Sequence, residues 1–480
     1  MPGVVVTTAV RTGPTTPNTA PASTFFVAGT AQRGPVDEAR LITGLVEFEA
    51  VYGTYSASDT LHQQVQTFFE EGGARVYVAR TVGASVAPTA GFLQIEGALR
   101  LDAANVGAWS SDLAVEIVEN NASKFAVRLI LNGELVYNTG YVVDVDAAVA
   151  AINASSVAAL LVTASVLGGN GGNALSEAAA VLLSAGTTVA PTEAELVDAL
   201  ALFDNALGAG AVAIPGNSSE TIWDGLLAHA QANNRIALLA FGSSDTAADA
   251  IDSVEGYDTD YGEYASFYFP YVTIPGPAGA PLSISPEAYA AAKRSVAHNS
   301  VGPWQPGAGL PSKARFVTGI ASAVDKPTGE DLDNGRINAI RIIQGSVRIY
   351  GARSGSADET NYRYITTRDT LNYIVSQAEQ RLEDLVFSPI DGRRSVFGQV
   401  EARLIALLDP LRTAGGLFEA FDSDGNRVDA GYSVEVTDAL NPLSQLANGV
   451  VRAKVGVRVS SISDRIEIEV VKSNLTSSVV

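Results

Sequence analysis

The chain has 480 residues, 47% of them hydrophobic and 17% charged, which predicts a globular protein with about three domains. Its 52 acidic and 31 basic residues leave a formal charge of −21, which argues against nucleic acid or an anionic membrane as the main partner. It has no cysteine, which excludes disulfides, thiolate metal sites and cysteine nucleophiles.

The first 24 residues read as an arm with a linker. Residues 3–10, GVVVTTAV, have the β-branched content of a strand, and the Pro- and Thr-rich residues 11–24 resist regular structure. A strand needs backbone partners, so this one either folds back onto its own sheet or reaches a neighbouring molecule. We expect no signal peptide and no membrane-spanning segment, because no apolar run approaches the roughly 18–20 residues that cross a bilayer.

Two compact regions follow the arm. Residues 25–90 predict the N-terminal part of a core, with a helix from near Asp59 to Gly72-Gly73 and a strand over 74–80. Residues 91–155 carry strand patterns, and Asn132-Gly133 between two apolar runs is a strong hairpin signal. We interpret the second region as a small inserted β-rich domain.

Residues 156–345 alternate between helix and strand patterns, which is typical of an α/β domain with a mostly parallel sheet. Thr192 to Glu195 predicts a capping box, and the helix that it opens has one apolar face. That face consists of Leu196, Leu200, Phe203 and Leu207. GAVAIPG, RIALLAFG and ASFYFPYV read as buried strands.

The remaining residues, 346–480, predict a C-terminal α+β domain. Its first helix is expected to open at Thr366-x-x-Asp369, and a second helical run and three closing strands follow. The expected apolar stripe of the first helix is Leu371, Ile374, Val375, Ala378, Leu382 and Leu385.

A glycine-rich stretch at 166–183, VLGGNGGNALSEAAAVLL, raises the possibility of a nucleotide site. Gly169-x-Gly171-x-x-Ala174 follows an apolar run and precedes a predicted helix, which is the order of a dinucleotide-binding turn. However, the preceding segment is weak as a central strand. The acidic residues at the required spacing, Glu193 and Glu195, are better explained by a helix start, so we favour a loop.

Catalytic and metal chemistry find little support in the sequence. His62 and His229 fall in amphipathic helices, whereas His298 is placed in a loop after a helix and is the best catalytic candidate. No serine lies in a G-x-S-x-G motif. Asp422-x-Asp424-x-Asn426 begins like a calcium loop, but Arg427 and Ser433 break the pattern, which favours a hairpin turn. We therefore expect no catalytic residues, no metal and no cofactor.

Several motifs, in order along the chain, resemble the contractile tail sheath family of bacteriophages and related injection devices. The first is the Arg33-Gly34-Pro35 turn after the opening PGVVVTTAV. The most specific lies in NGRINAIRIIQGSVRIYGARSG and NYRYITTRD, which carry Asn338, Gly351, Arg353, Tyr364 and Arg368. The family's Pro-Ala-Glu near the end is Ser463-Asp464-Arg465 here.

The resemblance implies a fold and a role. It implies a subtilisin-like α/β sheath domain without an active site at 156–345, the inserted β-rich domain, and a C-terminal domain with exchanged arms. The arms would add strands to neighbouring subunits through Val4, Val5, Val6, Ile466, Ile468 and Val470. A terminal strand packed on its own domain is the simpler alternative for the N-terminal arm.

The resemblance also implies partners: the chain itself in a helical stack of hexameric rings, a tail tube protein, and baseplate and tail terminator proteins. Such a subunit would assemble in the host bacterial cytoplasm, belong to the virion, and contract to drive the tube through the host envelope for genome delivery. The helix near 370–386 is one candidate for contact with the tube. The alternatives are a hydrolase or nucleotide-binding enzyme that uses His298 or the Gly169 loop, and a non-contractile surface protein.

Overall fold

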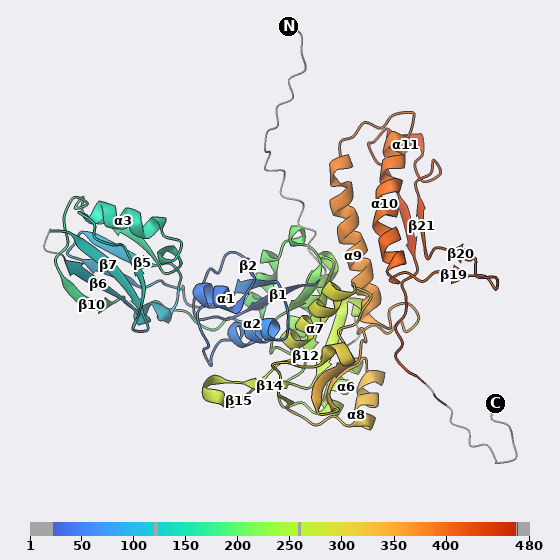
Figure 1. Ribbon diagram of the computed structural model, residues 1–480, viewed down its shortest axis with the longest axis horizontal. Coiled ribbons are helices and arrows are strands. Elements are labelled where there is room, and N and C mark those ends of the chain that lie inside the picture. The colour runs from blue at the N-terminus through green and yellow to red at the C-terminus, as the bar shows by residue number, and fades with distance from the viewer. Residues whose placement is uncertain (1–22, 120–122, 258–260, 467, 469–480) are drawn as a thin grey trace, which may run out of the picture. The chain divides into compact units, whose positions relative to one another are not determined.

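A computed structural model describes residues 23–119, 123–257, 261–466 and 468 (Figure 1). It divides into two compact units, residues 1–383 and 384–480, which are described separately. The predicted strand residues Val4, Val5, Val6 and Val470 lie outside the described residues. Within the described ranges, no helix combines the length and the apolar character that crossing a membrane requires.

The first unit is built on an eight-stranded sheet with the order β18-β17-β13-β12-β11-β1-β3-β2. The six central strands are parallel and the two edge strands, β2 and β18, are antiparallel to their neighbours. The strands are β1 (Thr24–Gly29), β2 (Arg40–Ile42), β3 (Val76–Arg80), β11 (Gly210–Ala213), β12 (Arg235–Ala240), β13 (Ala265–Phe269), β17 (Ile337–Ile343) and β18 (Ser346–Tyr350).

Both faces of this sheet are buried, which explains why its strands read as continuous apolar runs rather than alternating ones. In β1, Phe25 and Val27 belong to one apolar cluster, and Phe26 and Ala28 belong to the other. The first cluster includes residues of α1 (Leu45–Tyr52), α2 (Leu61–Glu70) and α7 (Glu287–Ser300). The second includes residues of α4 (Glu193–Asp198), α5 (Glu220–Ala232), α6 (Ala247–Gly256) and α8 (Lys326–Asn334). The predicted mostly parallel α/β sheet is confirmed.

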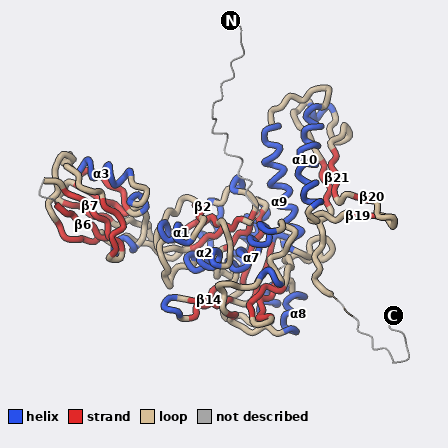
Figure 2. Tube along the Cα trace, in the orientation of Figure 1, coloured by secondary structure: helices blue, strands red, loops and turns tan. Residues whose placement is uncertain are grey.

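The inserted domain consists of two sheets and a helix around a core of its own (Figure 2). One sheet has the order β4-β5-β9 and the other β10-β6-β7-β8. The elements are β4 (Phe92–Ile95), β5 (Leu99–Ala103), β6 (Leu113–Glu119), β7 (Phe125–Leu131), β8 (Glu134–Asn138), α3 (Val145–Ala154), β9 (Val162–Val166) and β10 (Ala178–Leu182). The core extends from Ala98 to Leu183, beyond the boundary of 155 expected from the sequence.

Two of the local predictions in this unit are confirmed in detail. Asn132 and Gly133 form the turn between β7 and β8, both with positive φ (53° and 85°), as a type I′ hairpin requires. Thr192 and Glu195 form the predicted capping box of α4. The helix beyond it is shorter than expected, because residues Ala199–Leu202 and Asn205–Leu207 form 3₁₀ turns.

The rest of the first unit comprises a small sheet and the long helix α9 (Ile365–Leu382). The sheet has the order β15-β14-β16, formed by β14 (Val272–Pro275), β15 (Pro281–Ile284) and β16 (Gly319–Ile320). The expected start of α9 was wrong: Tyr364 is the N-cap, so Thr366 and Asp369 lie inside the helix. The expected apolar stripe was wrong in part, since Val375 is exposed while Thr366, Asp369, Thr370, Asn372 and Gln377 are buried.

The second unit contains α10 (Ser395–Thr413), α11 (Leu443–Leu446) and two small sheets. One face of α10 is buried and apolar, with Val396, Phe397, Val400, Leu404, Leu407, Leu408 and Leu411. The sheets are two-stranded: β19 (Ala420–Phe421) with β20 (Arg427–Asp429), and β21 (Tyr432–Glu435) with β22 (Lys454–Val457).

Candidate functional site

Asn338 forms the centre of a buried cluster of hydrogen bonds between three segments of the first unit, which we call the Asn338 knot. Its side-chain amide donates to the carbonyl oxygens of Phe267 and Arg353, each at 3.0 Å, and to Ser266 Oγ at 3.1 Å. Its Oδ1 accepts from the backbone N–H of Arg353 at 2.7 Å. Asn338 is fully buried, so these bonds satisfy a polar side chain that would otherwise be costly in the core. They tie the segment after β18 to β13 and β17.

Gly351 is required by the same knot. A Cβ added to it would lie 2.9 Å from Asn338 Oδ1, closer than real Cβ atoms approach, and 3.1 Å from Asn338 Cα, which is also a tight contact. The glycine therefore allows the backbone to pass against Asn338.

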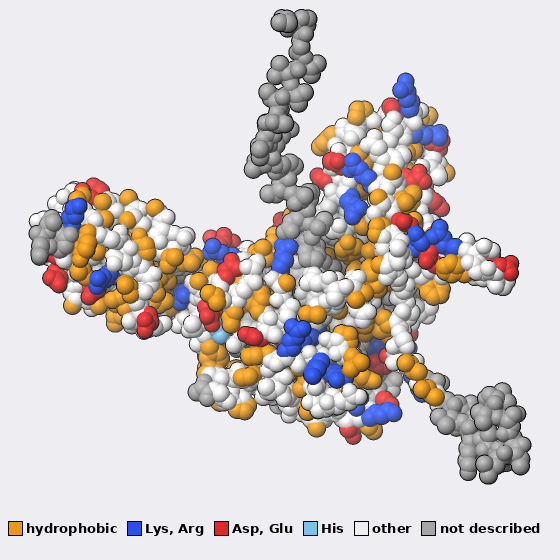
Figure 3. Space-filling view, viewed as in Figure 1, with side chains coloured by type: hydrophobic (Ala, Val, Ile, Leu, Met, Phe, Trp, Pro, Cys, Tyr) orange, Lys and Arg blue, Asp and Glu red, His pale blue; other side chains and the backbone are white. Residues whose placement is uncertain are grey.

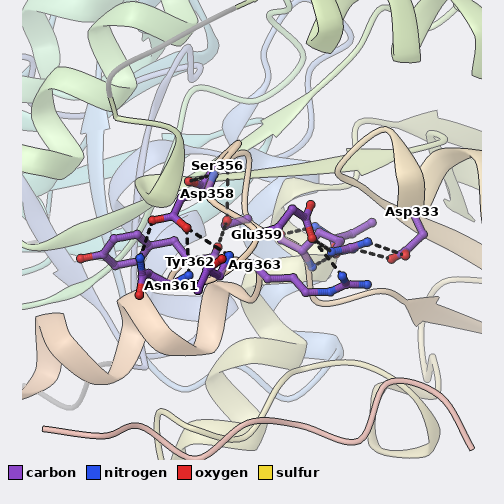
Figure 4. A network of polar contacts seen from close by, with 11 residues as sticks. Asp333, Ser356, Asp358, Glu359, Asn361, Tyr362 and Arg363 are labelled. Carbon is purple, nitrogen blue, oxygen red and sulfur yellow. Dashed lines mark hydrogen bonds and ion pairs between the residues drawn. The ribbon is translucent and has the colours of Figure 1, made fainter.

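Arg353 extends the knot into an ion-pair network, of which Figure 4 labels Asp333, Glu359 and Arg363. Its guanidinium donates two parallel bonds of 3.0 Å to the carboxylate of Asp333, at the end of α8, and a third of 3.0 Å to Glu359. Glu359 also accepts from Arg363 at 3.0 Å. Burial acts to lower the pKa of Arg353, but Asp333 and Glu359 outweigh it and raise the pKa above its ordinary value.

The remaining motif residues lie at the start of α9. Tyr364 forms an isolated antiparallel bridge with Arg353, directly before the helix begins. The Arg368 guanidinium lies over the ring of Tyr264 at 4.6 Å and donates to Asn372 at 2.9 Å. The structure thus brings Asn338, Gly351, Arg353 and Tyr364 together, with Arg368 one helical turn further on.

The Arg33-Gly34-Pro35 turn lies elsewhere, between the central sheet and the inserted domain. Gly34 has φ +107°, and a Cβ there would lie 2.4 Å from the ring of Tyr52. Arg80 donates to the carbonyl oxygens of Ala31, Gly34 and Val106, so it joins this turn to the chain that enters β6. Arg33 donates to the carbonyl of Glu49 at 2.8 Å and lies over Trp109.

Sequence reasoning missed a buried ion pair on α7. Lys293 Nζ lies 2.5 Å from Glu71 Oε2, and both side chains are almost fully buried. The Glu71 carboxylate also accepts from the backbone N–H groups of Arg315, Phe316 and Val317. Burial lowers the pKa of Lys293, and Glu71 opposes that shift. The signal was available, because Glu71 immediately precedes the Gly72-Gly73 helix end in the FFEEGGARVYVAR motif.

His298 does not lie in a loop, as the sequence predicted, but in the last turn of α7. Its Nε2 is 3.5 Å from Asp369, whose carboxylate also pairs with Arg294. Burial acts to raise the pKa of Asp369, but Arg294 and His298 outweigh it and lower the pKa. The cavity beside these residues is about 20 Å³, enough for roughly one water molecule. This arrangement links α7 to α9.

The Gly169 loop does not have the form of a phosphate site. The strand before it, β9, is an edge strand of the small β4-β5-β9 sheet. After it the chain enters the strand β10, where the sequence predicted a helix. The helix N-terminus beside the loop is that of α3, where the N–H of Val145 donates to the carbonyl oxygen of Asn173 rather than facing a phosphate. Gly171 instead accepts from the N–H of Asp146 in α3. The helix that the nucleotide hypothesis placed after the glycine-rich loop is therefore wrong.

No group of three histidine and carboxylate side chains suited to a metal occurs in the described part of the chain. Asp422 caps the β19–β20 turn by accepting from the N–H groups of Asp424 and Asn426, and those bonds lower its pKa. The hairpin interpretation of this motif is confirmed.

The second unit presents the exposed segment that carries the predicted C-terminal strand. Ile466 and Ile468 are 79% and 81% exposed, and neither is part of a strand within this chain. Among the described residues, the sheet of β21 with β22 has two strands. An isolated pair of strands is marginally stable in water, so this sheet is suited to accept further strands.

No family model and no curated protein matches the sequence. Solved structures do match. A sheath tail protein from Desulfitobacterium hafniense is 16% identical over 90% of this chain and 93% of its own, with a TM-score of 0.59. A sheath tail protein from Listeria innocua is 16% identical over 87% and 89%, with a TM-score of 0.61. A chain from the contracted sheath of an extracellular contractile injection system is 15% identical over 98% of each, with a TM-score of 0.58. The chain therefore has the fold of contractile sheath proteins, as the motifs indicated.

Proposed function

We propose that the chain is a structural tail sheath subunit, which polymerises around a tail tube and contracts to drive the tube through a host cell envelope. The observation that carries the proposal is the likeness to sheath tail proteins and to a contracted injection-system sheath over 87–98% of the chain. Genome delivery by a phage is the role that we favour; a bacteriocin-like device would use the same subunit.

The partners follow from this role. The subunit binds copies of itself in a helical stack of rings, a tail tube protein on the inside, and baseplate and terminator proteins at the two ends. Two of the similar structures are baseplates of the anti-feeding prophage, which supports contact with a baseplate. We place the assembled protein in the virion, formed in the bacterial cytoplasm, and we assign it no catalytic activity and no cofactor.

Exchanged arms would connect the subunits. The two-stranded β21–β22 sheet leaves edges to which strands from other subunits can add. The segment at Ile466 and Ile468 is exposed and has alternating apolar residues, and Val4, Val5 and Val6 have strand character behind a linker. Backbone pairing of this kind keeps neighbours connected while the linker lets their domains rotate and slide.

The buried networks suit a subunit that moves as a rigid body. The Asn338 knot and the Glu71–Lys293 pair connect helices and strands that are far apart in sequence. Force applied to one element of the first unit is thereby transmitted through packed and hydrogen-bonded contacts. Contraction would then change the contacts between subunits, from a kinetically trapped extended state, rather than the subunit's core.

Electron microscopy of the purified chain, beside a variant that lacks residues 1–20, tests the proposal. We expect the full chain to form long hollow tubes or stacked rings and the truncated chain to remain dispersed. Dispersed monomers from both proteins at high concentration would contradict self-assembly. Tubes from both proteins would support the sheath proposal and refute the role of the N-terminal arm.

The enzyme alternative has no favourable observation. His298 is held in α7 by the Asp369 contact, and the Gly169 loop is followed by a strand rather than by the helix that a nucleotide site needs. The subtilisin-like fold that the motifs imply for residues 156–345 stays a prediction.

A further inference from the structure

The inserted domain leaves both edges of its four-stranded sheet open. In the order β10-β6-β7-β8, the two outer strands are β10 and β8, each five residues long. Among the described residues, no further strand pairs along β8 or β10 themselves, and just beyond β10 the N–H of Ser184 donates to the carbonyl oxygen of Phe92 at the start of β4. Open edges present unpaired N–H and C=O groups, which make them templates for another strand.

An apolar row crosses the outer face of this sheet from one edge to the other. Leu182 lies opposite Ala114, Ala114 opposite Ile130, and Ile130 opposite Leu135. Residues that pair directly point to the same face, and the adjacent positions Val115 and Leu129 point inward to the core. The row ends in two exposed leucines, Leu182 at 57% and Leu135 at 55%.

The row is distinct from the rest of the face. Its neighbour on the same face contains Glu116 and Arg128, which pair with each other at 3.1 Å. These two charges compensate each other and need no outside partner. Figure 3 shows hydrophobic side chains at the surface of this domain among scattered charges. The leucine ends are therefore the part of the face that lacks a partner.

Strand direction makes the two edges complementary. All three pairings in the sheet are antiparallel, so β10 and β8 run in opposite directions. A second copy placed beside the first in the same orientation would thus bring its β10 antiparallel to β8. If the apolar rows of the two copies are aligned, Leu182 of the second copy lies directly opposite Leu135 of the first. The register of pairing shifts between Ala178 and Val181 in β10, and between Leu135 and Tyr137 in β8.

Apart from these two register shifts, the edges lack the usual protection against such pairing. Edge strands commonly carry lysine, proline or inward charges, whereas β10 consists of alanine, valine and leucine alone. The single charge of β8 is Glu134, and β10 offers no like charge to oppose it.

We propose that this sheet continues from one copy of the chain into the next, by pairing of β8 in one copy with β10 in its neighbour. The contact uses two different surfaces, so repetition generates a ring or a helix rather than a closed pair of subunits. In this respect the inference rests on the proposed helical assembly. It adds an outer connection between subunits, independent of the terminal arms.

Cysteine pairs provide the test, because the chain has no cysteine of its own. Residues opposite each other in antiparallel strands are close enough for a disulfide. In full-length Leu135→Cys/Leu182→Cys under mild oxidation, we expect a ladder of covalent multimers on non-reducing gels. Each single variant should stay monomeric. The matched control is Val157→Cys/Leu182→Cys, since Val157 is 50% exposed in the same domain but outside both edges; it should form no ladder.

The outcomes separate this inference from the proposed function, provided that the same samples are viewed by electron microscopy. Tubes without a ladder would overturn the sheet contact and leave the sheath proposal in place. A ladder without tubes would support the contact and count against the sheath. A dimer from Leu182→Cys alone would show pairing of β10 with itself and overturn the inference. Absence of both tubes and ladder would contradict both proposals.

Discussion

At the scale of single residues, the motif positions form buried polar contacts with one another. Both the nitrogen and the oxygen of the Asn338 side-chain amide are hydrogen-bonded, and Gly351 has no Cβ that would collide with that amide. Arg353 then connects the knot to α8 through Asp333. Each residue has a role that depends on the others, which explains why they occur together as one sequence pattern.

Removal of the Arg353 side chain should therefore destabilise the first unit strongly. Arg353→Ala leaves Asp333 and Glu359 without their shared cation. Because both carboxylates are partly exposed, we expect a loss of roughly 1.5–3 kcal/mol in the free energy of unfolding, as for hydrogen bonds to charged groups. Arg353→Lys should recover only part, because an ammonium cannot form the two parallel bonds to Asp333. Denaturant titration of unassembled protein measures both. The exposed pair of Lys326 and Glu330 is the control, and Lys326→Ala should change stability by less than about 0.5 kcal/mol.

Glu287 should make stability depend on pH near neutrality. It is buried at the start of α7, and burial raises its pKa to about 7. Because the unfolded pKa is lower, the folded state holds a proton that the unfolded state releases, so stability falls as pH rises from about 4.5 to about 7. Glu287→Gln removes this penalty. We expect it to raise the melting temperature at pH 8 and to change it little at pH 4.5. Equal effects at both pH values would contradict the assignment.

At the scale of elements, the sequence predicted well wherever the cause is local. The Asn132-Gly133 turn, the Thr192 capping box and the Asp422 hairpin all depend on residues within five positions of each other. Buried strands such as β12 were also recognisable, because they have an apolar run of the right length.

Prediction failed where a distant partner decides the structure. The sequence around Asp369 predicts a helix-capping carboxylate. In the structure Asp369 is buried inside α9 and pairs with Arg294, 75 residues earlier in the chain. His298 lies in α7 rather than in a loop, and its partner Asp369 is likewise on a segment remote in sequence. The polar buried face of α9 likewise reflects partners such as the carbonyl of Arg235, which bonds Asn372. No local pattern contains this information.

The C-terminal strand offers a prediction at this scale. Ile466→Asp/Ile468→Asp places charges on a segment that is exposed in the single chain, so the melting temperature of the monomer should not change. Tube formation should be lost if the segment adds to a neighbour's sheet, because paired strands bury these positions. Thermal melts and electron microscopy of the same preparation provide the two readings. Val46→Asp is the control, as Val46 is 82% exposed in α1. Normal tubes from the double variant would refute strand exchange here.

At the scale of the whole molecule, the charge of −21 governs association. Copies of an acidic subunit repel one another, and salt screens that repulsion over about 8 Å at physiological ionic strength. The contacts proposed between copies are backbone pairing and apolar rows, which salt does not weaken in the same way. Assembly should therefore be slow at low salt and faster as salt is added.

Light scattering during assembly, from about 0.01 M to about 0.5 M sodium chloride, measures this dependence. We expect the rate to increase with salt and then to level off once the repulsion is screened. Sulfate should promote assembly further, because it strengthens apolar burial beyond its screening effect. A fall in rate with rising salt would point the other way, to attraction between opposite charges on neighbouring subunits as the dominant contact. The charged pairs of the second unit, such as Arg458 with Asp429, would then be the first to examine for partners in another copy.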